Sequence, residues 1–158
     1  MSDLDERGSD AASDVDDEMR DVLSRLTGGN KAIRGAEPAT LIEKIIRERI
    51  YESTYWKEHC FAVTAASILD KAVEVKYLGG IYGNVLPSPF LCLMLKLLHM
   101  QSDPAIVAEY VRQDDFKYIR ALGAFYLRLT GEPKDVYAAL EPLLYDYRKL
   151  RLRRAGAY

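Results

Sequence analysis

The sequence contains few of the residues on which enzyme and metal chemistry depends. Among 158 residues there are only two histidines, two cysteines and one tryptophan. The four strongest metal-ligand candidates, His59, Cys60, Cys92 and His99, form neither a CxxC nor an HxxxH pair, so their spacing matches no zinc signature. Catalysis without a metal would need a nucleophile paired with a base, and no such pair is evident. We therefore expect a protein that is not an enzyme and holds no cofactor or metal.

Phosphate loops and membrane spans are also missing. Segment 79–84, GGIYGN, is rich in glycine, but the Lys and Ser/Thr that should follow a phosphate loop are absent. It predicts instead a tight turn that displays Tyr82. The most apolar stretch, 91–100, has about half of the ~20 residues that a membrane span requires. With no secretory signal, the chain is expected to be intracellular, to avoid membranes and to keep its thiols reduced.

Charge is distributed unevenly along the chain. The net charge is −2, yet residues 1–21 hold nine acidic and two basic residues, so the remainder carries +5. Residues 1–30 are expected to form an acidic arm. Within it an amphipathic helix is predicted by apolar residues at helical spacing, namely Val15, Met19, Val22, Leu23 and Leu26.

The remaining residues, 31–158, predict one compact all-α domain. Apolar residues recur there at helical spacing, and no segment has a convincing strand pattern. The last helix begins near Pro133, is expected to bend at Pro142, and ends in a basic segment, 147–154. The other expected helices cover residues 38–51, 54–60, 65–77, 90–100, 105–113 and 116–130.

One arginine conflicts with its helical face. In 41–51 the isoleucines and Leu41 occupy one half of the helix, and Arg49 falls in the middle of that apolar arc. A buried arginine needs a carboxylate or several carbonyl oxygens around it. We therefore expect Arg49 to be buried and paired, and Arg49→Ala to cost about 3 kcal/mol or more.

Segment 116–130, FKYIRALGAFYLRLT, is apolar around most of its circumference. Its three cations, Lys117, Arg120 and Arg128, form one narrow stripe. Such a helix is expected near the middle of the fold, with the stripe at its wet edge. Gly131 is expected to end it through a positive φ.

Five segments resemble the pre-mRNA-splicing factor 38 family. The resemblance runs in order from about Ile33 to Leu150 without large gaps. Many family members continue into an extension rich in Arg and Ser that this chain does not contain. The segments are KIIRERIYESTYWKEHCF (44–61), GGIYGN (79–84), PSPFLCLMLKLL (87–98), DFKYIRALGAFYLRLTG (115–131) and DVYAALEPLLYDYRKL (135–150).

The resemblance implies an all-helical, non-enzymatic scaffold that acts in the nucleus. Such scaffolds bind helical segments of other splicing proteins, notably a microfibrillar-associated-protein-like partner and a zinc-finger splicing protein. They arrive with the tri-snRNP or the precatalytic spliceosome and are needed for activation before catalysis. Outside the complex we expect a monomer.

Two sets of surface residues follow as hypotheses. Large aromatics and arginines dominate protein interfaces, so the predicted partner-binding residues are Tyr51, Tyr55, Trp56, Tyr82, Lys117, Arg120 and Arg128. The alternative function is an RNA-binding module that uses surface tyrosines and a basic C-terminal helix. Its candidate contacts with RNA, or with an acidic partner, are Arg148, Lys149, Arg151, Arg153 and Arg154.

Overall fold

The computed structural model describes residues 32–82 and 86–154, so the predicted helix at 15–26 lies outside the described residues. The regular secondary structure of the described chain consists of helices and one two-stranded hairpin, which confirms the all-α prediction. In order, it comprises the 3-10 helix η1 (Pro38–Leu41), α2 (Lys44–Glu52), the π-helix η2 (Trp56–Cys60), α3 (Ile68–Val73), strands β1 (Ile81–Tyr82) and β2 (Leu86–Pro87), α4 (Pro89–Met100), α5 (Pro104–Arg112), α6 (Lys117–Thr130), α7 (Pro133–Leu140) and the 3-10 helix η3 (Glu141–Tyr145).

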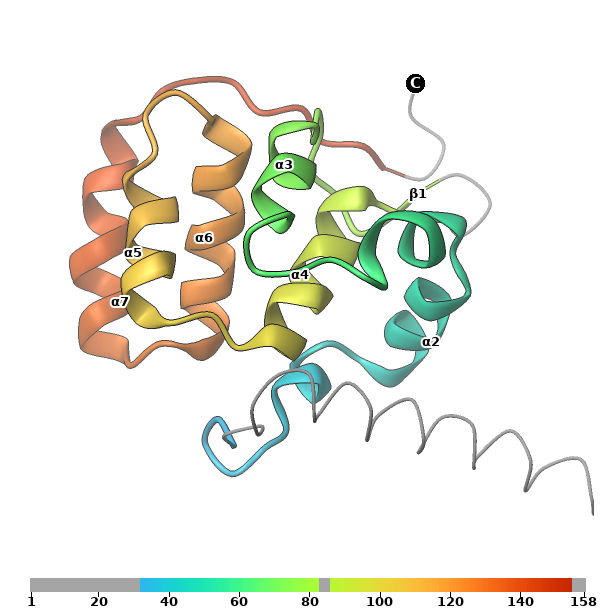
Figure 1. Ribbon diagram of the computed structural model, residues 1–158. Coiled ribbons are helices and arrows are strands. Elements are labelled where there is room, and N and C mark those ends of the chain that lie inside the picture. Colours follow the sequence, from blue (N-terminus) through green and yellow to red (C-terminus); the bar gives the residue numbers. More distant parts are fainter. Residues whose placement is uncertain (1–31, 83–85, 155–158) are drawn as a thin grey trace, which may run out of the picture.

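The helices are arranged around α4. Figure 1 shows α5, α6 and α7 side by side at one end of the molecule, α2 at the other, and α4 between them. Helix α4 begins where Ser88 caps it, because the Ser88 side chain accepts a hydrogen bond from the Leu91 amide and Pro89 fits the first turn. Its side chains from Cys92 to His99 are all buried.

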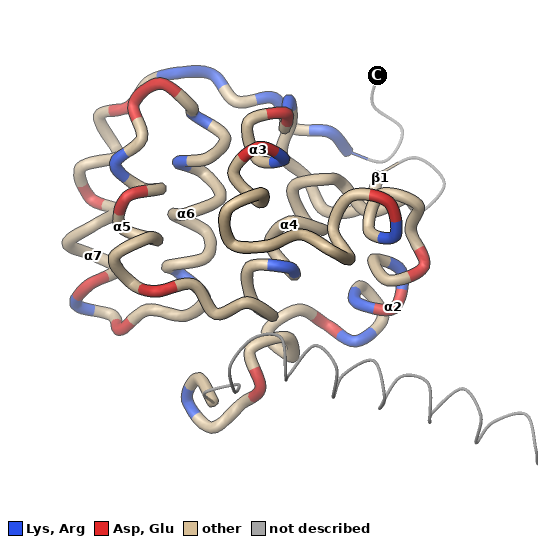
Figure 2. Tube along the Cα trace, in the orientation of Figure 1, with Lys and Arg blue, Asp and Glu red and all other residues tan. Residues whose placement is uncertain are grey.

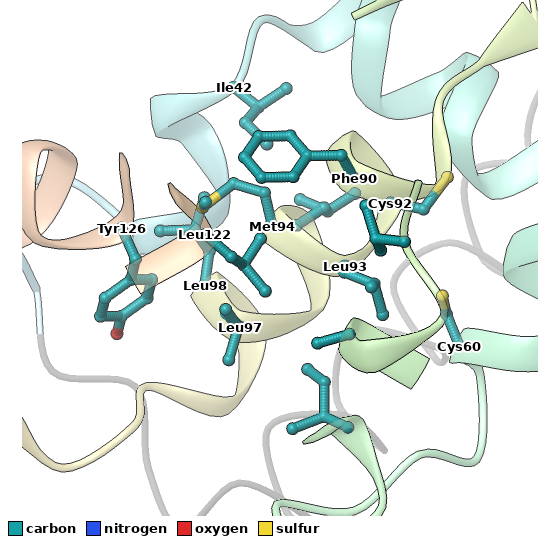
Figure 3. Packing of buried hydrophobic residues seen from close by; sticks show 14 of the residues in the cluster. Ile42, Cys60, Phe90, Cys92, Leu93, Met94, Leu97, Leu98, Leu122 and Tyr126 are labelled. Atoms are coloured by element: carbon teal, nitrogen blue, oxygen red, sulfur yellow. The ribbon is translucent and has the colours of Figure 1, made fainter. Parts of the chain in front are cut away.

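The centre of the fold is therefore α4 and not, as expected, segment 116–130. Leu93, Met94, Leu97 and Leu98 of α4 meet Leu122 and Tyr126 of α6 in the core (Figure 3). Helix α6 contacts α3, α4, α5 and α7 but leaves Phe116 and Phe125 exposed. Segment 116–130 is thus covered by four helices, as expected of a core helix, but α4 is more completely buried, which apolar content alone did not reveal.

Helix α6 can approach α5 closely because it carries a glycine at the contact. A Cβ added at Gly123 would lie 2.6 Å from the Tyr110 Cβ. Gly131, which follows α6, does not adopt the expected positive φ, since its φ is −79°. A Cβ there would lie 2.7 Å from the Leu127 carbonyl oxygen, so close approach, not backbone conformation, favours glycine.

Lys96 lies in the core, which the sequence did not predict. It lies in α4 with only 5% of its surface exposed. Its ammonium donates a hydrogen bond of 3.0 Å to the Phe61 carbonyl, just after η2, and lies 5.9 Å from the centre of the Trp56 ring. Burial lowers the pKa of Lys96. A basic group thus satisfies a carbonyl at the end of η2 from inside the core.

Arg49 is exposed, and no carboxylate is paired with it among the described residues, so the prediction of a buried ion pair is wrong. The apolar arc assumed a continuous helix from Leu41, but η1 ends at Leu41 and α2 begins only at Lys44. The buried side of α2 then follows Ile50, and Arg49 lies about 100° away on the side of exposed Ile45.

Strands β1 and β2 pair as a short antiparallel hairpin, which the sequence did not predict. Ile81 pairs with Pro87, and Tyr82 pairs with Leu86. The Ser88 hydroxyl donates a hydrogen bond of 2.5 Å to the Gly79 carbonyl, which joins the hairpin to the start of α4. Two-residue strands lie below the length at which side-chain alternation can be recognised.

The chain after η3 runs as an extended strap, which we define as residues 146–154. It crosses the molecule from α7 toward β1 (Figure 1). The helix does not bend at Pro142, as was expected, because α7 already ends at Leu140 and the 3-10 helix η3 follows it. The basic segment 147–154 is therefore not helical, contrary to the prediction. Its far end pairs in parallel with Leu78, whose amide donates to Arg151 and whose carbonyl accepts from Arg153.

Candidate protein-interaction surface

A pocket of about 390 Å³ opens between the end of α3, η2 and the start of α4. Apolar surface predominates in its wall, while Glu74 and Lys76 place one charge of each sign there. Tyr55 brings one predicted partner-binding residue into the wall. Concave apolar surface with a few polar groups is typical of sites that receive a ligand or a partner side chain. The lining residues are Tyr55, Glu74, Val75, Lys76, Tyr77 and Pro89.

Beside this pocket, two tyrosines and an arginine form one cluster. The Tyr77 and Tyr82 rings meet edge to face at 5.8 Å, and the Arg153 guanidinium lies 3.9 Å from the Tyr82 ring centre and 5.4 Å from that of Tyr77. Burial raises the pKa of Tyr77, and a hydrogen bond with Tyr82 adds to that rise. The structure thus brings together Tyr82 and Arg153, which the sequence assigned to two different sets.

The strap packs against Gly79, a position that requires glycine. Gly79 has a φ of +146°, and a Cβ there would lie 2.5 Å from the Arg153 carbonyl oxygen. An L side chain would therefore be strained and would also collide with strap backbone. This glycine, predicted only as part of a turn, lets the strap lie against the hairpin.

The other predicted aromatic anchors are less accessible. Trp56 is only 4% exposed and packs edge to face on Tyr51, with 5.3 Å between ring centres. The Tyr51 hydroxyl and His99 Nε2 lie 2.7 Å apart in a hydrogen bond. Trp56 therefore packs in the core, while Tyr51 remains partly exposed.

The cationic stripe of α6 separates into three different environments. Arg120 has a side chain only 15% exposed and is bound to the carbonyls of Val111 and Arg112 and to Asp146. Lys117 donates a 2.5 Å hydrogen bond to the Lys149 carbonyl of the strap. Only Arg128 is exposed with no hydrogen bond or ion pair in the described part of the chain. Two of the three cations of the stripe, Lys117 and Arg120, therefore bind groups within the fold.

Asp146 holds the beginning of the strap. Its carboxylate accepts hydrogen bonds of 2.8 Å from Arg120 Nη1 and of 2.7 and 2.8 Å from Arg148 Nη2 and Nε. Those bonds, first with Arg148 and then with Arg120, hold the pKa of Asp146 well below its usual range. Arg120 also pairs with Asp114. Arg148 is thus committed to an internal ion pair.

The remaining cations of the strap are accessible. Lys149, Arg151 and Arg154 are exposed, and their side chains have no hydrogen bond or ion pair within the described residues. Figure 2 shows Lys and Arg positions following one another along this segment. Lys149, Arg151 and Arg154 therefore remain candidates for contact with RNA or with an acidic partner.

Sequence reasoning missed the most exposed apolar side chains. Tyr137, Leu144 and Tyr147 belong to the segment that was expected to form one long helix, and their exposed fractions are 68, 76 and 82%. Tyr145 is exposed to 79%. Pro142, where the sequence predicted a bend, was the signal that this helix would not continue.

Within residues 32–82 and 86–154, no group of three His, Cys, Asp or Glu side chains could hold a metal ion. The two cysteines, Cys60 and Cys92, are free and buried, and burial raises their thiol pKa values to about 12 and about 11. Such thiols are poor nucleophiles. No helix of the described chain is long and apolar enough to cross a membrane.

Known proteins share this sequence and fold. The family model described as the PRP38 family matches residues 31–157. Pre-mRNA-splicing factor 38A of Xenopus tropicalis is 54% identical over 133 residues, which are 84% of this chain and 43% of the relative. Pre-mRNA-splicing factor 38 of Drosophila melanogaster is 56% identical over 139 residues, 87% of this chain and 42% of the relative. The chain thus spans less than half the length of these relatives.

A solved structure has the same fold. It is described as the crystal structure of the Snu23-Prp38-MFAP1(217-258) complex of Chaetomium thermophilum, and the matching chain is 50% identical, with a TM-score of 0.77. The match covers 82% of this chain and 69% of that one. On the extent and identity of these matches, the chain belongs to the PRP38 family.

Proposed function

We propose that this chain is a splicing factor that works without catalysis, as a nuclear scaffold that binds helical segments of other spliceosomal proteins. The observation that carries the proposal is the 390 Å³ pocket beside Tyr77, Tyr82 and Arg153. Tyrosine and arginine around a concave apolar site are the composition of an interface hot spot. Tyr55 lines the pocket and supplies a further aromatic group.

The relatives support the same function. The solved relative is a complex of Prp38 with Snu23 and an MFAP1 fragment, residues 217–258. We propose that this chain also binds an MFAP1-like segment and a zinc-finger splicing protein. As its place of action we propose the tri-snRNP or the precatalytic spliceosome, where such scaffolding is needed for activation.

Calorimetric titration of the 158-residue chain with MFAP1(217–258) of Chaetomium thermophilum tests this function. We expect saturable 1:1 binding, and Tyr55→Ala should weaken it about tenfold or more, as truncation of a hot-spot residue does. Tyr137→Ala is the matched control, because Tyr137 is an exposed tyrosine outside the pocket wall and should leave the affinity unchanged.

The two parts of the proposal fail separately. Absence of binding to the fragment would refute the scaffold function with this partner. Binding that Tyr55→Ala leaves unchanged would keep the scaffold function and exclude the pocket as the anchor. Circular dichroism melts of each variant verify that the fold is retained.

A further inference from the structure

We propose that the strap and the end of η3 form a binding site for single-stranded RNA, separate from the pocket. Its groups are the rings of Tyr145 and Tyr147 and the cations of Lys149, Arg151 and Arg154. Proteins that bind single strands combine stacking rings with a positively charged track for the phosphates. Here the two rings and the three cations all lie within the ten residues 145–154.

The two rings are free to stack. Tyr145 and Tyr147 are 79 and 82% exposed, and neither packs against another ring in the described part of the chain. Burial of a large side chain is favourable, so an aromatic ring left in water on a fixed backbone is available for a ligand. Bases present flat faces to such rings whatever their sequence.

The cations are free as well. The neighbouring Asp146 is neutralised from within by Arg120 and Arg148, so it does not offset the charge of the strap. Lys149, Arg151 and Arg154 have no ion pair among the described residues. Phosphate groups are the ligand class that such a row of uncompensated cations attracts.

The strap backbone is held in place before any ligand arrives. The Lys149 carbonyl accepts from Lys117 Nζ, and the Arg151 amide donates to the Tyr118 hydroxyl at 3.1 Å. Arg151 and Arg153 also bond through their backbones to Leu78. Ordering the strap therefore costs little on binding, because the fold has already fixed it.

An acidic protein segment is the rival ligand, and the position of two exposed rings beside the cations favours RNA over it. Carboxylates would use the three cations but would gain little from two nearly fully exposed rings. RNA uses both sets of groups. The inference is independent of the pocket and of the proposed scaffold function.

The test is fluorescence anisotropy of a 5′-labelled 12-nucleotide oligouridylate with the full chain, from 50 to 300 mM salt. Three phosphate contacts predict a slope of log K against log salt of about −2, since each contributes about −0.7 on single strands. Lys149→Ala/Arg151→Ala should make that slope shallower by about 1.4. Tyr145→Ala/Tyr147→Ala should weaken binding about tenfold or more at an unchanged slope.

Tyr137→Ala/Lys134→Ala is the matched control, since both side chains are exposed outside the strap, and it should bind as the wild type does. Absence of RNA binding at 50 mM salt would overturn the proposal. So would equal binding by all variants, or a tyrosine variant that binds like the wild type, since either result reduces the contact to unspecific charge. Competition by oligoglutamate at the same concentration as oligouridylate would assign the site to an acidic protein instead.

Discussion

At the scale of single residues, the fold depends on an ion-pair node that the sequence presented as surface charge. Arg120 was expected on a solvent-facing stripe, yet its guanidinium binds Asp146, Asp114 and two backbone carbonyls. Arg148 binds the same carboxylate. These contacts join the strap to α6 and to the loop after α5. Charge reversal at Arg120 would therefore test the stability of the fold, whereas reversal at Arg128 tests binding.

Asp146→Asn should destabilise the protein in a pH-dependent manner. The folded-state pKa of Asp146 lies below that of the unfolded chain, about 3.9. Its stabilisation is thus fully present above that pH and is lost as pH falls through the folded pKa. We expect the difference in urea midpoint between wild type and variant to be constant from pH 5 to 8 and to shrink below about pH 4.

Glu141→Gln provides the matched comparison, because Glu141 is an exposed carboxylate with no ion pair within the described residues. It should shift the midpoint little at any pH. An Asp146→Asn effect that is the same at pH 3 and pH 7 would show that the carboxylate charge does not stabilise the strap.

At the scale of elements, close packing of α5 on α6 fixes the end of the molecule from which the strap departs. The contact depends on Gly123, where a Cβ would lie 2.6 Å from the Tyr110 Cβ and 3.2 Å from the Val111 amide nitrogen. A glycine inside a helix normally weakens it. Here the gain in packing between two helices offsets that local cost.

Gly123→Ala should therefore destabilise the protein in spite of alanine's higher helix propensity. Alanine gains up to about 1 kcal/mol in a helix, whereas overpacking costs about 1–3 kcal/mol. We expect a net loss of about 1 kcal/mol or more in urea unfolding. Gly80→Ala is the control, because a Cβ there meets no atom within 4 Å. If Gly123→Ala were as stable as the wild type, α5 and α6 would be able to move apart and accommodate the added methyl group without loss of stability.

At the scale of the whole molecule, the chain joins an acidic arm to a basic body. Residues 1–30 were predicted to contain an amphipathic helix, and they lie outside the described residues. Along the strap, Lys and Arg positions follow one another, as Figure 2 shows. Opposite charges on one chain attract over about 10 Å at 0.1 M salt, and the attraction weakens as salt rises. The arm therefore remains a candidate for masking a binding surface.

Deletion of residues 1–29 should tighten binding of MFAP1(217–258) at low salt. If the arm occupies the partner's surface for part of the time, its removal abolishes that competition. The gain should shrink at high salt, where charge attraction is screened. The measurement is the affinity of full-length and truncated chains at both salt concentrations. Equal affinities throughout would exclude masking, and weaker binding after truncation would make the arm part of the partner's site.

Sequence alone determined the class of fold, because helical periodicity is a local property, and the resemblance of five segments to the splicing factor 38 family indicated the family. It also located the starts of α4 and α5 to within one residue and the basic character of segment 147–154. What it could not determine was the environment of each residue. Burial depends on how many elements surround a helix, so α4 and not α6 became the centre.

Only the tertiary structure decided which charges are free. Arg49 lies in solvent because α2 starts three residues after Leu41, and Lys96 lies in the core because the Phe61 carbonyl meets it there. Arg120 and Arg128 have the same charge and lie on one helix, yet the first is held by Asp146, which is 26 residues away along the chain. Contacts between segments distant in sequence leave no periodic signal, and these contacts separate structural cations from those available for binding.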